Sequence, residues 1–182
     1  FIFNNDSFLK NNDDEMAQSI LGIVNESLMQ NSNQPQNYNY LIFYLSLSLK
    51  LNKAFNEAYF YSAQLYQNLK KYRKAEEFYN KIENDHSLYL ESQINIAINK
   101  SYEKKLEEAE KNLIFLLNSK PQNERVLVAL ADLYRTSKQY KKAIQVYSKT
   151  LNNLSIDENQ KWKLLYKRGI CYEKLDNWKS AE

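Results

Sequence analysis

The apolar residues of this chain follow a pattern that changes phase at regular intervals. Between residues 127 and 151, two apolar stripes are separated by the polar residues Ser137, Lys138 and Gln139. The first stripe consists of Leu127, Leu130, Ala131 and Tyr134, and the second of Tyr140, Ala143, Ile144, Tyr147 and Leu151. Apolar residues three and four positions apart lie on one face of an α-helix. This segment is therefore predicted to form a hairpin of two helices.

The same pattern occurs four times, and each copy has an alanine anchor. The anchors are Ala75, Ala109, Ala143 and Ala181; the first two intervals are equal, and the third is four positions longer. Twelve positions before each anchor stands a small residue: Ala63, Ala97, Ala131 and Gly169. Small residues at these positions let the two helices of a hairpin approach closely, and larger apolar residues fill the gaps around them. Units of this length cannot bury their apolar faces alone, so they must stack on their neighbours.

The repeated hairpin resembles the tetratricopeptide repeat, a helical hairpin whose length equals the first two anchor intervals. In the third copy the signature of the family falls on Leu127, Leu130, Ala131, Tyr134, Tyr140, Ala143 and Tyr147. The resemblance covers about residues 55–182. Gln93, Lys100 and Arg168 stand where the family has apolar or aromatic residues. The resemblance implies an all-α fold, a right-handed α–α superhelix in which antiparallel helical hairpins form a solenoid.

Three parts are predicted along the chain. Residues 1–12 are expected to be a linker with a few docking aromatic residues, and residues 13–53 a divergent N-terminal helical hairpin. Residues 54–182 are expected to hold four tetratricopeptide repeats, the last incomplete, in a single continuous solenoid. About ten helices are predicted, near 13–30, 39–52, 54–69, 72–84, 88–101, 104–118, 122–136, 140–153, 158–174 and from 177 onward.

The two ends of the sequence indicate that it is part of a longer protein. It begins at Phe1 rather than Met and stops one residue after Ala181, where the rest of a second helix is expected. We therefore expect a fragment of a longer protein. Abundant Asn, Lys, Ile and Tyr fit an AT-rich genome, and with the style of the repeats they indicate a bacterial protein. The compartment stays open: cytoplasmic, or periplasmic if a signal peptide precedes this fragment.

Composition and charge narrow the class of partner. With 43% hydrophobic and 26% charged residues the chain is typical of globular proteins. The net charge is only +3, which does not favour nucleic acid as a partner. Lys70, Lys71, Lys138 and Lys142 lie near equivalent turns, where they form either a basic edge for an acidic partner or a solvated surface. The longest apolar run, residues 40–51, is too short for a membrane span, which needs about 20 residues.

Catalytic chemistry is nearly absent from the sequence. The chain has one histidine, His86, and one cysteine, Cys171, and neither lies in a recognisable motif. A phosphate loop, a dinucleotide fingerprint, a zinc-binding helix and a nucleophile elbow are all missing. We therefore predict no enzymatic activity, no cofactor and no metal site.

The resemblance implies that the first helices of successive hairpins line a concave groove that binds peptides. The residues predicted to face this groove are Glu57, Phe60, Gln64, Ile94, Ile98, Arg125, Val128, Asp132, Arg135, Tyr166 and Ile170. The apolar members form a strip that either contacts a partner or is covered by neighbouring helices of the chain. The lysine and asparagine clamp of chaperone-docking members is missing, since Phe60 with Gln64, and Val128 with Asp132, occupy its positions.

These features predict a non-enzymatic scaffold that binds a peptide or helix of a partner protein in the groove. One alternative is the targeting or regulatory region of an enzyme whose catalytic domain lies outside this fragment. A third hypothesis, an RNA-binding helical repeat, requires affinity that falls steeply with salt. The identity of the partner, the pathway and the oligomeric state are not determined by the sequence.

Overall fold

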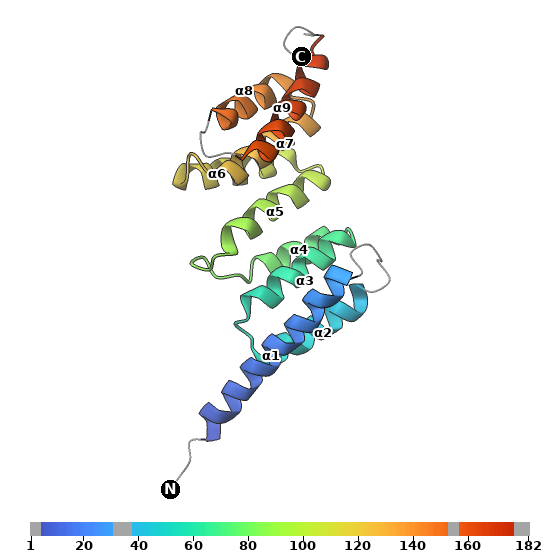
Figure 1. Cartoon of the computed structure of the whole chain (residues 1–182), viewed down its shortest axis with the longest axis vertical. Helices are drawn as coiled ribbons and strands as arrows, with labels where there is room; N and C mark the ends of the chain where they lie inside the picture. Colours follow the sequence, from blue (N-terminus) through green and yellow to red (C-terminus); the bar gives the residue numbers. More distant parts are fainter. Residues whose placement is uncertain (1–4, 31–37, 153–156, 177–182) are drawn as a thin grey trace. The chain divides into compact units, whose positions relative to one another are not determined.

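A computed structural model describes residues 5–30, 38–152 and 157–176, and these ranges are entirely helical apart from short turns (Figure 1). The helices are α1 (Asn5–Gln30), α2 (Tyr38–Leu51), α3 (Asn56–Asn68), α4 (Tyr72–Tyr79), α5 (Tyr89–Tyr102), α6 (Leu106–Ser119), α7 (Glu124–Thr136), α8 (Tyr140–Leu151) and α9 (Glu158–Glu173). No strand occurs in the described ranges. The predicted all-α helical-repeat fold is confirmed.

The chain divides into two compact units, residues 1–92 and 93–182. In the first unit α1 packs on α2, α2 on α3, and α3 on α4, as the blue and teal helices of Figure 1 show. Its core is formed by Val24, Tyr38, Leu41, Leu45, Ala58 and Leu65. In the second unit α6 packs on α7, α7 on α8, and α8 on α9. The single continuous solenoid over residues 54–182 stays a prediction.

Two helix boundaries differ from those predicted. Helix α1 begins at Asn5, so residues 5–12 are helical rather than a linker. No proline or glycine interrupts the sequence from Asn5 to Leu21, and the backbone hydrogen bonds can continue through its polar residues.

Helix α4 ends at Tyr79 rather than near residue 84. The amides of Lys81 and Ile82 donate to carbonyls only three positions back, for example Ile82 to Tyr79 (3.2 Å), which tightens the chain into turns. The fourth anchor, Ala181, and the helix predicted from residue 177 onward lie outside the described residues.

The turns within the first three repeats each contain a lysine in the left-handed conformation. These residues are Lys70 (φ 57°), Lys104 (φ 64°) and Lys138 (φ 62°). In the third turn the amide of Gln139 donates to the carbonyl of Tyr134 (2.8 Å), and the amide of Lys138 to that of Arg135 (3.1 Å). This pair of bonds is the Schellman motif, in which glycine usually occupies the left-handed position. The polar break in the apolar pattern is therefore a helix-ending turn of defined geometry.

We expect Lys138→Gly to stabilise the protein by about 0.5–1 kcal/mol. Removing Cβ relieves about 1–2 kcal/mol of left-handed strain, which exceeds the roughly 0.5–1 kcal/mol of extra chain entropy that glycine loses on folding. Urea unfolding of the two proteins measures the difference. The control is Lys141→Gly on the exposed face of α8, which should cost about 1 kcal/mol. Equal effects of the two substitutions would contradict the explanation.

One pair of side chains at equivalent positions joins the two helices of a hairpin in each of the first three repeats, but the kind of interaction differs between repeats. In the first and third repeats a lysine of the second helix lies over a tyrosine ring of the first: Lys74 over Tyr66 (5.5 Å) and Lys142 over Tyr134 (4.9 Å). The equivalent residues of the second repeat are Lys100 and Glu108, and their side chains form an ion pair (3.3 Å). A cation–π contact is thus replaced by a salt bridge. This exchange explains how the repeat accommodates Lys100 at a position where the family has an aromatic residue.

The extra four residues before the fourth repeat lengthen the start of α9. Helix α9 has 16 residues and α7 has 13. The interval from Glu124, the first residue of α7, to Glu158, the first residue of α9, equals the regular anchor spacing, whereas the interval from Ala131 to Gly169 is four positions longer. One additional turn therefore precedes the equivalent positions. The side chain of Asp157 caps this turn by accepting from the amide of Gln160 (2.9 Å). The insertion leaves α9 packed on α8, as predicted.

Candidate functional site

The predicted groove residues do not form one uniformly exposed strip. Phe60 is buried, and its ring packs edge-to-face on Tyr79 with the centroids 5.7 Å apart. Ile94 is also buried, whereas Ile98, Val128 and Ile170 are half-buried and Tyr166 is exposed. Of the two alternatives for the apolar strip, cover by the chain itself applies to Phe60 and Ile94, because folding removes both side chains from solvent. Of the polar members, Glu57, Gln64, Asp132 and Arg135 are half-buried and Arg125 is exposed.

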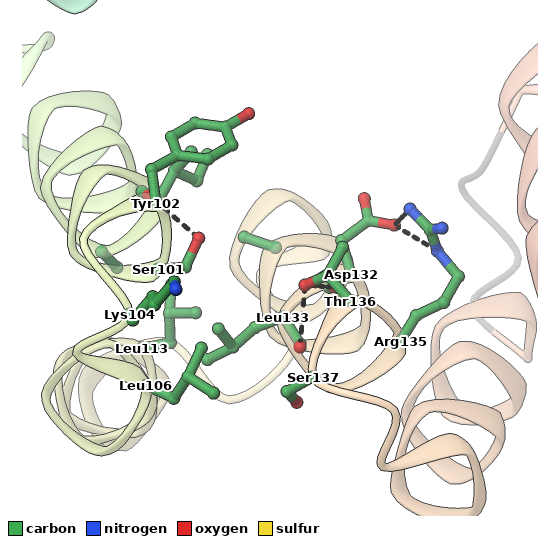
Figure 2. Close-up of a pocket in the computed structure, with 13 residues that line it drawn as sticks. Ser101, Tyr102, Lys104, Leu106, Leu113, Asp132, Leu133, Arg135, Thr136 and Ser137 are labelled. Atoms are coloured by element: carbon green, nitrogen blue, oxygen red, sulfur yellow. Dashed lines mark hydrogen bonds and ion pairs between the residues drawn. The ribbon is translucent and has the colours of Figure 1, made fainter. Parts of the chain in front are cut away.

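A pocket of about 430 Å³ lies within the second unit and brings three of the predicted residues together: Ile98, Asp132 and Arg135. We call it the α5–α7 pocket, because most of its lining comes from these two helices and the rest from α6 and the adjoining turns. Its apolar lining includes Ala97, Ile98, Leu106, Leu113, Ala129 and Leu133. Its polar lining comprises Ser101, Tyr102, Lys104, Asp132, Arg135, Thr136 and Ser137. Figure 2 shows Ser101 and Tyr102 on α5 across from α7, with Leu106, Leu113 and Leu133 lower in the space between the helices.

The corresponding place in the third repeat is filled by a hydrogen-bonded cluster around Asp132, which we call the Asp132 network. The Tyr147 hydroxyl donates to Oδ1 of Asp132 (2.6 Å), and Lys167 Nζ of α9 donates to Oδ2 (2.7 Å). Arg135 donates from Nη2 to Asp132 Oδ1 (3.2 Å) and from Nε to the Tyr147 hydroxyl oxygen (3.3 Å). The network joins α7, α8 and α9 through charge-assisted hydrogen bonds.

Burial and charge in the Asp132 network change the proton affinities of its members. Burial and the hydrogen bond to Asp132 raise the pKa of Tyr147 far above its ordinary value, so the hydroxyl stays a donor. Burial alone would lower the pKa of Arg135, but Tyr147 and Asp132 outweigh it, so the pKa rises. Burial also raises the pKa of the nearby Cys171 thiol, which therefore stays protonated and less nucleophilic. The network consequently holds α7, α8 and α9 together through hydrogen bonds from the Tyr147 hydroxyl, Arg135 and Lys167.

The α5–α7 pocket exists because the second repeat has smaller residues at all four positions of this network. The third repeat has Tyr147, Asp132, Arg135 and, from the next helix, Lys167. The second repeat has Leu113, Ile98, Ser101 and Ala129 at the equivalent positions, and all four line the pocket. The first repeat is filled like the third, since the Tyr79 hydroxyl hydrogen-bonds to Oε1 of Gln67 (3.2 Å). Shorter side chains at the equivalent positions thus leave the α5–α7 pocket open in the second repeat.

Sequence reasoning identified Ile98, Asp132 and Arg135 but did not predict that Leu113 and Ala129 leave a pocket open beside them. The sequence placed Ser101 on the same outward face as Ile98 and Leu113 among the apolar positions of the repeat, and it gave no role to Ala129. A signal for them was present in the sequence: Leu113 stands where the repeats before and after it have a tyrosine, Tyr79 and Tyr147. Comparing side-chain size position by position between repeats would have found it.

Other kinds of site receive no support from the described residues. Within the ranges that the structure describes, no group of three or more His, Cys, Asp or Glu side chains is arranged to hold a metal ion. None of the helices in these ranges combines the length and apolar character that crossing a membrane requires.

Comparison with known proteins supports the repeat assignment. A family model described as tetratricopeptide repeat matches residues 57–87, which include α4 and all of α3 except its first residue. No curated protein sequence matches the chain. Residues 57–87 are therefore a tetratricopeptide repeat.

Solved structures resemble the chain over nearly its whole length. MamA (residues 41 to the end) from Desulfovibrio magneticus RS-1 has a TM-score of 0.67 at 17% identity, covering 91% of this chain and 89% of that one. PilW, described as a widely conserved type IV pilus biogenesis factor, has a TM-score of 0.67 at 13% identity and covers 94% and 88%. YrrB, described as a tetratricopeptide-repeat protein with an unusual peptide-binding site, has a TM-score of 0.59 at 13% identity and covers 97% and 86%. At these identities the likeness shows the fold, which is that of tetratricopeptide-repeat proteins.

Proposed function

We propose that this chain is a non-enzymatic scaffold that binds a peptide or helix of a partner protein at the α5–α7 pocket. The observation that carries the proposal is the pocket itself, whose lining combines apolar side chains with several polar ones. Small binding sites in proteins typically enclose about 300–1,000 Å³ and combine apolar walls with a few polar groups. The same fold holds a peptide-binding site in YrrB, according to the description of that protein.

The chemistry of the pocket favours a protein partner over a polyanion. The charged residues of the pocket lining are two cations, Lys104 and Arg135, and the carboxylate Asp132, which forms an ion pair with Arg135 (3.2 Å). Binding of a nucleic-acid backbone requires several unbalanced cations. Apolar contacts with Ile98 and Leu133, flanked by hydrogen-bonding groups such as Thr136, suit the side chains and backbone of a peptide.

Selection of short displayed random peptides on the chain tests this proposal. Fluorescence anisotropy then gives the Kd of the enriched peptides. We expect Ile98→Asp to weaken them at least about tenfold, because a desolvated carboxylate replaces an apolar contact. The matched control is Ile114→Asp, since Ile114 is exposed on α6 and is not part of the pocket lining.

The controls also define failure of the proposal. Circular dichroism must show that Ile98→Asp retains the helices of the wild-type chain. If folded Ile98→Asp binds the enriched peptides as tightly as the wild type does, the pocket is not the binding surface. If no peptide is enriched, the chain is not a binder of short linear peptides.

A further inference from the structure

The first and third repeats show what kind of group the second repeat lacks. In both repeats a tyrosine of the second helix is fully buried, and its hydroxyl forms a hydrogen bond with the polar residue twelve positions earlier. The pairs are Tyr79 with Gln67, and Tyr147 with Arg135. In the second repeat these positions hold Leu113 and Ser101, which line the α5–α7 pocket. The chain therefore fills this place with a phenol ring in two repeats and leaves it open in the repeat between them.

The lining of the pocket matches an aromatic group with a polar tip. Its interior walls carry Leu106, Leu113 and Leu133, and aromatic rings contribute a large apolar contact area when they are buried against such residues. Ser101 uses its hydroxyl hydrogen to donate to the carbonyl of Ile98 (2.7 Å), so its oxygen retains lone pairs that can accept. A phenol hydroxyl that enters the pocket beside Ser101 can donate to the Ser101 oxygen. In the first repeat the Tyr79 hydroxyl donates in the same way to Gln67, the equivalent residue.

We propose that the α5–α7 pocket takes an aromatic side chain, tyrosine foremost, from a partner peptide, which supplies the ring that the second repeat lacks. This inference rests on the proposed peptide-binding function and specifies its anchor residue. The anchor is a buried aromatic group surrounded by weaker contacts, an arrangement that often dominates the affinity of an interface. Lysine, glutamate and short aliphatic side chains lack an aromatic ring that ends in a hydroxyl.

The first test uses p-cresol, the side chain of tyrosine with its Cβ, as the probe. Titration into the methyl-labelled chain is followed by NMR. We expect saturable shifts at the methyl groups of Ile98, Leu113 and Leu133, and at least several-fold weaker binding of 3-methyl-1-butanol, a branched aliphatic alcohol. Absence of saturable p-cresol shifts at these methyl groups, or equal binding of the two compounds, overturns the proposal.

A variant that fills the pocket provides the matched comparison. Ser101→Gln with Leu113→Tyr reproduces the pair found in the first repeat, and it should abolish p-cresol binding while leaving the helices intact. The control Lys111→Gln with Ile114→Tyr adds the same residue types on the exposed face of α6 and should bind p-cresol like the wild type. Should the filled variant fail to fold, Ala129→Leu narrows the pocket from α7 and should weaken p-cresol binding at least about tenfold. Undiminished p-cresol binding by folded variants of both kinds overturns the proposal.

The displayed peptides separate this inference from the proposed function. We expect the enriched peptides to share an aromatic residue at one position, and its replacement by alanine to raise Kd at least tenfold. Peptides that depend on Ile98 but contain no required aromatic residue overturn the aromatic anchor and leave the proposed function standing. Saturable p-cresol binding without any enriched peptide supports an aromatic site and removes the proposed peptide-binding function.

Discussion

Replacing Tyr147 by alanine is expected to lower the free energy of unfolding by about 3–5 kcal/mol, the range for removing a large aromatic side chain from a core. The side chain is fully buried between α7, α8 and α9, so its loss leaves a cavity as well as lost apolar contacts. The substitution also removes the hydroxyl that donates to Asp132 (2.6 Å) and accepts from Arg135 (3.3 Å). Urea unfolding monitored by circular dichroism measures the change.

A conservative variant separates the two contributions of Tyr147. Tyr147→Phe retains the ring and removes only the hydroxyl, so it is expected to cost about 1.5–3 kcal/mol, the range for hydrogen bonds to charged groups. Asp132 keeps its bonds to Arg135 and Lys167 in this variant, which limits the cost. Equal stability of Tyr147→Phe and the wild type would show that the hydrogen bonds of the Tyr147 hydroxyl do not stabilise the fold.

The second large effect is expected from Ala143→Leu, which should destabilise the protein by roughly 1–3 kcal/mol through overpacking. Ala143 on α8 is fully buried, as predicted, and so is Ala131 on α7, the helix that packs against α8. A larger side chain must push the two helices apart or adopt a strained rotamer. Thermal unfolding compares the variant with Lys141→Leu, an exposed position on α8 where the change should stay within about 0.5 kcal/mol. An unchanged midpoint for Ala143→Leu would show that the helix contact tolerates more volume than its burial indicates.

The repeat architecture followed from local patterns, which the sequence carries explicitly. The burial of Ala75, Ala109 and Ala143 could be predicted, because only small residues fit where two helices approach closely. The polar breaks marked the turns, although sequence alone did not show that Lys138 and its equivalents adopt the left-handed conformation. Helix ends were less predictable, as the early start of α1 and the early end of α4 show. End positions depend on a few backbone hydrogen bonds, and several residues can supply these equally well.

The candidate site depended on the tertiary structure. The sequence by itself determined that Ile98 and Asp132 are equivalent positions on the first helices of successive hairpins. Only the folded chain showed that Phe60 is covered by neighbouring side chains, while Ile98 borders an open pocket. The reason is physical: whether a space stays open depends on the combined volume of side chains from several helices. Leu113, Ser101 and Ala129 come from three different helices, and they leave that space only where the fold brings them together.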